Sequence, residues 1–246
     1  MLIELLADIA KMTLFVACTY AAINVYVRRV HSDWAERLTK RRVAILAILT
    51  FAVGAIKVIE DVVAKESGPV DEMVLWFIRD QVPSSLTGFF TLVTLSGSRS
   101  FLLPVTLMAA AALLITRHRV QAAFLCTAML IAPLVVYTLK MIVDRARPAL
   151  WETQWYWGSS FPSGHTLGTA AFSTAAALCI GRIWPRYGNL AMVIAAIWTS
   201  LVALSRLVLG VHWPSDVLAA ICIGAFISLA INIAFELKTV TSRCVR

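Results

Sequence analysis

Two histidines, His165 and His212, stand where long apolar stretches begin, in "PSGHTLG" and "VHWPSDV". Asp216 follows His212 by about one helical turn, so on a helix the two side chains share a face. A carboxylate placed there can hold one ring N–H and leave the other nitrogen free to attack, which is the arrangement of a covalent nucleophile and its orienting group. His165 comes from another stretch and could protonate a leaving oxygen as a general acid. We interpret these three residues as candidate catalytic groups.

Cations and a helix start near the histidines predict a phosphate pocket. Pro162 suits the first turn of a helix, where its missing N–H costs nothing. The amides that follow it have no intrahelical acceptor and carry partial positive charge, and phosphate commonly binds such a terminus. Gly164 would let the backbone approach an anion closely. Lys140, Arg147 and Arg206 add positive charge, and the forked donors of the two arginines match phosphate oxygens.

Seven apolar stretches must position these residues, over 9–28, 43–64, 100–116, 120–141, 163–181, 188–208 and 214–236. The chain of 246 residues is 60% hydrophobic and 15% charged, with a mean hydropathy of +0.80. Average soluble domains are only about 45–50% apolar and about 25% charged. Because a spanning helix needs about 20 mostly apolar residues, the sequence predicts an all-α, polytopic membrane helix bundle. We expect residues 1–246 to form a single integral membrane domain of six core transmembrane helices, with a seventh at the N-terminus.

Lysines and arginines are unevenly placed and predict which way the chain faces. Segment 28–42 carries six of them, and pairs follow at Arg117 and Arg119 and at Arg182 and Arg186. If every stretch crosses, these segments and the C-terminal tail share one side, which the positive-inside rule assigns to the cytoplasm. The candidate residues and the N-terminus then face the opposite side. The same rule accounts for the net charge of +8, and no aromatic-interleaved basic stripe suggests nucleic acid.

Three further features are open to interpretation. Segment 65–99 contains "DEMVLWFIRD", an expected interfacial helix that belongs either to an ordinary surface loop or to a cap over the substrate. The stretch 150–160, with three tryptophans and a tyrosine, either anchors the chain at the membrane interface or also lines a lipid entrance. Asp144 and Arg145 are interpreted as interfacial residues beside the candidate site, with Arg145 within reach of a lipid headgroup.

The motifs Lys140-x6-Arg147-Pro148, Pro162-Ser163-Gly164-His165 and Ser205-Arg206-x5-His212-x3-Asp216 together resemble the three signature motifs of the type 2 phosphatidic acid phosphatase (PAP2) superfamily. The resemblance covers residues 100–236 and departs from the pattern at no motif position. It implies an all-helical membrane enzyme that works without a metal or other cofactor. His212 would attack phosphorus and form a phosphohistidine, Asp216 would orient it, and His165 would protonate the leaving group. The residues implied to hold the phosphoryl oxygens are Lys140, Arg147, Ser163, Gly164 and Arg206.

The resemblance implies hydrolysis of a membrane lipid phosphate without fixing the lipid. Members act on undecaprenyl diphosphate, phosphatidylglycerophosphate, phosphatidic acid or lipid A, and some transfer the phosphate to another lipid. We expect a phosphatase of the bacterial inner membrane that takes its substrate from the outer leaflet, with undecaprenyl diphosphate or phosphatidylglycerophosphate favoured. A lipid phosphotransferase or a lipid A phosphatase with the same pocket is the alternative. A transporter is disfavoured because transport sites usually lie near the membrane midplane, and no obligatory protein partner is implied.

Overall fold

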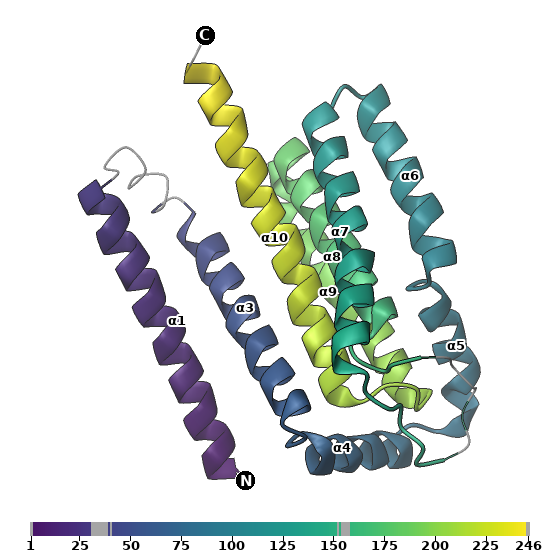
Figure 1. Ribbon diagram of the computed structural model, residues 1–246. Helices are drawn as coiled ribbons and strands as arrows, with labels where there is room; N and C mark the ends of the chain where they lie inside the picture. Colours follow the sequence, from purple (N-terminus) through teal and green to yellow (C-terminus); the bar gives the residue numbers. More distant parts are fainter. Residues whose placement is uncertain (1, 31–38, 40, 152, 154–157, 245–246) are drawn as a thin grey trace.

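The computed structural model describes residues 2–30, 39, 41–151, 153 and 158–244, and the regular structure within them is helical. In chain order the helices are α1 (Leu2–Val30), α3 (Arg42–Val63), α4 (Gly68–Gln81), α5 (Thr87–Leu95), α6 (Arg99–Ile115), α7 (Arg119–Val143), α8 (Gly164–Ile183), α9 (Gly188–Val208) and α10 (Pro214–Cys244). Single 3-10 turns, η1 (Ser84–Leu86) and η2 (Pro185–Tyr187), precede α5 and α9. The long helices run side by side, and α4 lies across one end of the bundle (Figure 1). The predicted all-α bundle is confirmed.

Six helical segments are long and apolar enough to cross a membrane: Ala7–Val30, Arg42–Val63, Arg119–Val143, Gly164–Ile183, Pro185–Val208 and Pro214–Glu236. They match six of the seven predicted stretches, the N-terminal one included, and the chain is an integral membrane protein. The exception is the stretch 100–116. Its helix α6 has 17 residues, which rise about 26 Å, short of the roughly 30 Å of a bilayer core.

A bend joins α6 to the chain before it. The segments Ser84–Leu95 and Arg99–Ile115 meet at 44° and reach a crossing length only as a pair, which would be the seventh span. A Cβ on Gly97, in the bend, would lie 2.7 Å from Val202 Cγ1 and 2.9 Å from Thr169 Oγ1. Glycine is therefore needed where the bend touches α8 and α9. The second half of segment 65–99 is built into the bundle and is not an ordinary surface loop.

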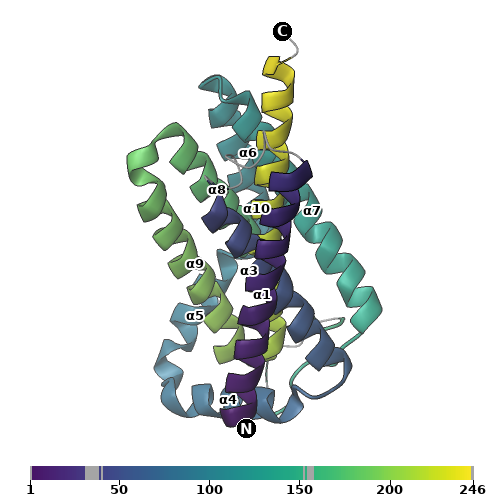
Figure 2. The same cartoon turned by 90° about the vertical axis from the view of Figure 1, so that its left-hand side faces the viewer.

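Helix α8 is the most enclosed of the six candidate spans. In its apolar segment 61% of the residues are buried, compared with 6% in α1. Its many small residues let neighbouring backbones approach closely; a Cβ on Gly224 of α10 would lie 2.6 Å from the carbonyl oxygen of Leu167 in α8. Helix α8 contacts α7, α9 and α10, and Figure 2 shows it between α9 and α10. This tight packing fixes where the start of α8 lies.

Helix α1 lies at the edge of the bundle against α3 (Figure 1). Lys57 Nζ of α3 lies 2.6 Å from Asp61 Oδ1 and 4.0 Å from Asp8 Oδ2 of α1. These contacts lie at the end of the bundle that also holds α4, which we call the α4 end. Helices α7 and α9 finish at the α4 end, and α8 and α10 begin there (Figure 1).

Candidate active site

The three motif stretches meet at the α4 end. Lys140 lies in the last turn of α7, and Ser163 caps the start of α8. Arg206 lies in the last turn of α9, and Asp216 in the first turn of α10. Each motif therefore sits where a helix ends or begins, and the packing of α7, α9 and α10 around α8 brings these helix ends together.

Helix α8 begins later than the sequence predicts. Ser163 is its N-cap, in an extended conformation (φ −67°, ψ 110°), and the helix starts at Gly164. Pro162 precedes the helix, so its predicted place in the first turn is wrong. The reason is a contact with another helix: the N–H of Ser163 donates to the carbonyl oxygen of Asp216 at 3.2 Å. The first amides of α8 still lack intrahelical acceptors, so this helix start keeps the donors expected of an anion site.

His212 is the best candidate for the nucleophile. Its side chain is buried, with 2% of the residue exposed. Its Nδ1 lies 3.4 Å from Asp216 Oδ2, which also accepts the N–H of Trp213 at 2.9 Å. Its Nε2 lies 3.4 Å from Arg147 Nη1. Burial lowers the pKa of His212 to about 4, against the opposing effect of Asp216 and together with the charges of Arg206 and Arg147. The imidazole is therefore neutral at pH 7, as an attacking nitrogen must be.

Two predicted cations are anchored by backbone carbonyls. Arg147 donates from Nη1 to the carbonyl oxygen of Val211 at 2.8 Å and from Nε to that of Gly158 at 3.2 Å. Lys140 Nζ donates to the carbonyl oxygen of Ser159. The turn before His212 thus holds Arg147 beside that imidazole, and the chain before α8 holds both Arg147 and Lys140.

The third cation, Arg206, is held by α5. It is 1% exposed, and its Nη1 donates to Thr94 Oγ1 at 2.7 Å. Helix α5, just before the bend at Gly97, therefore supplies a partner for this guanidinium. His165 belongs to the same cluster. The charged or titratable groups within its electrostatic reach are Lys140, Arg147, Arg206 and His212.

The structure thus gathers the candidate residues from four helix ends. Ser163 is buried, and its Oγ accepts the hydroxyl of Thr166 at 3.1 Å. The arrangement combines a neutral imidazole nitrogen, a second imidazole and several cations, a combination suited to nucleophilic catalysis on an anionic substrate. The residues gathered at the α4 end are Lys140, Arg147, Ser163, Gly164, His165, Arg206, His212 and Asp216.

Sequence reasoning missed partners of this cluster. The interpretation of Arg145 as an interfacial residue is wrong, because its Nη1 donates to Asp216 Oδ1 at 2.8 Å. Asp71 of α4 is buried and pairs with the same guanidinium. Thr94 was not singled out either. The signal for Arg145 was its place two residues before Arg147, on the motif itself. No spacing rule connects Asp71 to Arg145, 74 positions away, or Thr94 to Arg206, 112 positions away.

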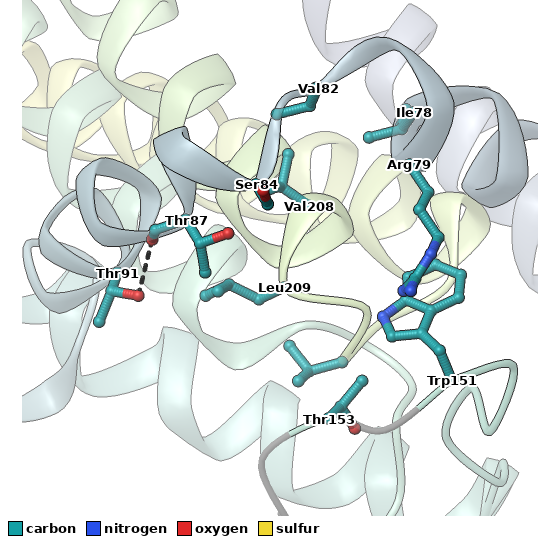
Figure 3. A pocket seen from close by; sticks show the side chains of 11 residues that line it. Ile78, Arg79, Val82, Ser84, Thr87, Thr91, Trp151, Thr153, Val208 and Leu209 are labelled. Carbon is teal, nitrogen blue, oxygen red and sulfur yellow. Dashed lines mark hydrogen bonds between the residues drawn. The ribbon is translucent and has the colours of Figure 1, made fainter.

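A cavity of about 440 Å³ lies beside the cluster, between α4, α5 and the end of α9 (Figure 3). Figure 3 shows Arg79 stacked on Trp151, with the guanidinium carbon 4.4 Å from the ring centre. Hydroxyl groups of Ser84, Thr87 and Thr91 line the other side. Trp151 is the one tryptophan of the aromatic stretch whose surroundings can be described; residues 154–157 lie outside the described residues.

Comparisons with known proteins agree with this geometry. The family model of the PAP2 superfamily matches residues 121–239, which include all three motifs. Phosphatidylglycerophosphatase B of Escherichia coli (strain K12) is 44% identical over 63 residues, 26% of this chain and 24% of that protein. Lipid A 1-phosphatase of Rhizobium etli is 32% identical over 123 residues, 46% of this chain and 50% of that protein. The chain therefore spans about a quarter of the length of the Escherichia coli protein and about half of the length of the Rhizobium etli protein.

The fold is also that of a solved membrane protein. A transmembrane PAP2 type phosphatidylglycerolphosphate phosphatase from Bacillus subtilis has a TM-score of 0.67 and is 23% identical, and the match covers 75% of this chain and 96% of that one. The match supports the arrangement of the helices. The resemblance to the PAP2 superfamily that the three motifs predict is confirmed over residues 121–239, where the family model matches.

Proposed function

We propose that this protein is a membrane lipid phosphatase that works through a phosphohistidine on His212. The observation that carries the proposal is the placement of that imidazole: Nδ1 faces Asp216, and Nε2 faces Arg147. A buried neutral ring with one nitrogen held by a carboxylate has its other nitrogen available for attack. The guanidinium beside Nε2 marks the place of a phosphoryl oxygen.

In the first step His212 Nε2 attacks phosphorus, and the bond from phosphorus to the lipid oxygen breaks. The bound phosphoryl group brings negative charge among the cations and so favours the protonated form of His165. That imidazolium gives its proton to the leaving oxygen, so the lipid leaves as a neutral alcohol or a lipid phosphate. Asp216 accepts the Nδ1–H and compensates the positive charge that develops on the ring. Lys140, Arg147 and Arg206 compensate the charge on the phosphoryl oxygens.

In the second step water attacks the phosphohistidine and the phosphorus–nitrogen bond breaks. His165, which lost its proton in the first step, accepts one from the water. Inorganic phosphate leaves and both imidazoles return to their starting forms. The cations that held the phosphoryl oxygens in the first step hold them again in the second, so one pocket serves both steps.

We assign the substrate to phosphorylated lipids of the outer leaflet of a bacterial inner membrane. The names of the relatives from Escherichia coli and Bacillus subtilis refer to phosphatidylglycerophosphate, and that of the Rhizobium protein to lipid A. We favour phosphatidylglycerophosphate and undecaprenyl diphosphate. The hydroxyl-lined cavity beside Val211, whose carbonyl accepts from Arg147, offers a polar headgroup room next to the phosphate site.

The test is phosphate release from purified phosphatidylglycerophosphate, undecaprenyl diphosphate, phosphatidic acid and lipid A in detergent, with EDTA present. His212→Ala should abolish release while the protein stays monodisperse. His118→Ala is the matched control, because His118 precedes α7 at the opposite end of the bundle, and it should retain full activity. Wild-type rates in His212→Ala would overturn the assignment of the nucleophile. Phosphate appearing on an added lipid acceptor in place of free phosphate would identify a phosphotransferase.

A further inference from the structure

Asp71 is a buried carboxylate on a helix whose other charged side chains are exposed. It stands in the first turn of α4 and is 2% exposed, whereas Glu72, Trp76 and Phe77 on the same helix are exposed. Burying a charged group costs free energy unless it is paired and hydrogen-bonded. This carboxylate must therefore have hydrogen-bond donors or cations as partners.

The two oxygens of Asp71 bind Ser215, at the start of α10, and one of them also binds Arg145. Oδ1 accepts the N–H of Ser215 at 2.9 Å, and Oδ2 accepts the hydroxyl of Ser215 at 2.6 Å. Oδ2 also accepts Arg145 Nη2 at 2.6 Å. These contacts join α4 to residues 74 and 144 positions further along the chain.

Arg145 bridges Asp71 to the carboxylate that orients the nucleophile. Its Nη1 donates to Asp216 Oδ1 at 2.8 Å and to the hydroxyl of Ser215 at 2.7 Å. The other oxygen of Asp216 faces His212 and the N–H of Trp213. With a partner on each oxygen, the Asp216 carboxylate cannot rotate away from the imidazole.

The charge of Asp71 matters as well as its position. Arg145 divides its positive charge between two carboxylates, Asp71 and Asp216. If Asp71 were neutral, the guanidinium would act on Asp216 alone. Asp216 would then stabilise a positive charge on His212 less well, in an enclosed site where such effects are large.

We infer that Asp71 is a positioning residue of the phosphatase, acting through Arg145 and Ser215 on the Asp216 carboxylate that orients His212. The inference rests on the proposed function, since it is the attack by His212 that the network serves. It also gives α4 a role, because this helix supplies one carboxylate of the hydrogen-bond network that holds His212.

The test compares Asp71→Asn with Asp80→Asn, an exposed carboxylate near the end of the same helix. Asparagine keeps the shape of Asp71 but has one acceptor oxygen where the aspartate has two. We expect kcat to fall by about 10-fold or more, towards the roughly 100-fold that a 1 Å misplacement costs. KM and inhibition by inorganic phosphate should stay within about twofold, since the phosphate pocket is intact. Asp80→Asn should match wild type.

Two readouts separate positioning from a merely structural role. First, the effects of Asp71→Asn and Arg145→Gln should be non-additive, with the double variant no slower than Arg145→Gln alone, because one acts through the other. Second, the acid limb of kcat/KM should move to lower pH in Asp71→Asn, because the surroundings of His212 become more positive. The charged or titratable groups facing His212 are Asp216 of α10, Arg206 of α9, His165 of α8 and Arg147 of the α7–α8 connection.

The outcomes distinguish this inference from the proposed function. A wild-type kcat in Asp71→Asn, alongside an inactive His212→Ala, would overturn the role of Asp71 and leave the phosphatase standing. If the wild type releases no phosphate, both fall. If Asp71→Asn is not monodisperse, Ser67→Ala takes its place, because Ser67 Oγ accepts Arg145 Nη2 at 3.1 Å. A smaller loss of kcat is then expected, and an unchanged kcat would overturn the inference.

Discussion

At the scale of single residues, the site depends on one imidazole being neutral among fixed cations. His212 has a carboxylate on one side, which raises its pKa, and guanidinium groups on the other, which lower it. Its burial has the largest effect and lowers the pKa. The protonated ring would have to be desolvated beside Arg147 and Arg206. A histidine on a surface would be partly protonated near pH 6.5 and to that extent unable to attack. Enclosure therefore keeps His212, the proposed nucleophile, in its neutral form in mildly acid surroundings.

This predicts the acid side of the pH–rate profile. The pKa of His212 is lowered to about 4, so the neutral form persists as the pH falls from 7 and is lost only as the pH passes through about 4. We expect kcat/KM of the free enzyme to fall on the acid side near pH 4, well below the roughly 6.5 of an exposed histidine. Phosphate release in buffers from pH 3 to 9, with circular dichroism to verify folding, measures it. An acid limb near pH 6.5 would show that burial does not govern this group.

At the scale of elements, the turn between α9 and α10 has to deliver His212 with little freedom. Gly210 has φ +65°, a conformation that side chains disfavour, and a Cβ there would lie 2.7 Å from three atoms of the Trp151 ring. Val211, next in the turn, accepts a hydrogen bond from Arg147. The turn is thus packed against Trp151 on one side and hydrogen-bonded to Arg147, a proposed phosphate ligand, on the other.

Gly210→Ala should therefore shift His212, the proposed nucleophile. The new methyl group must push against Trp151 and hold a strained backbone, at a cost of about 1–3 kcal/mol. We expect a lower unfolding temperature and a reduced kcat. Trp151→Ala in the same chain should relieve the clash but leave the strain, and so recover part of the loss. Gly88→Ala is the control, since a Cβ on Gly88 meets nothing within 4 Å. Equal behaviour of the two alanine variants would contradict this account of the turn.

The elements also show what a sequence can predict. Six spans and the motif positions at helix ends followed from apolar length and from residue types, both of which are local. A full crossing was predicted over 100–116 because this stretch is apolar throughout. The bend that precedes α6 depends on contacts of Gly97 with α8 and α9, which no local pattern reveals. Asp71 and Thr94 were missed for the same reason: their partners Ser215 and Arg206 lie 144 and 112 positions away.

At the scale of the whole molecule, the bundle has two chemically different ends. The α4 end carries the site, α4 and the N-terminus (Figure 1). The opposite end carries the basic turns, and charged side chains on loops that stay in the cytoplasm are enriched in Lys and Arg. The arginines at the opposite end, among the residues that the structure describes, are Arg28, Arg29, Arg41, Arg42, Arg117, Arg119, Arg182 and Arg186. This asymmetry favours a site that faces away from the cytoplasm.

The orientation can be tested with single cysteines in a chain whose five native cysteines are replaced by serine. Ser85→Cys lies in η1 at the α4 end and Thr116→Cys in the turn after α6, and both positions are exposed. A membrane-impermeant maleimide added to intact bacterial spheroplasts should label Ser85→Cys and spare Thr116→Cys until the cells are lysed. The opposite pattern would place the pocket in the cytoplasm. The substrate would then have to come from the inner leaflet, because the fixed cations at the α4 end reach a phosphate only on the side they face.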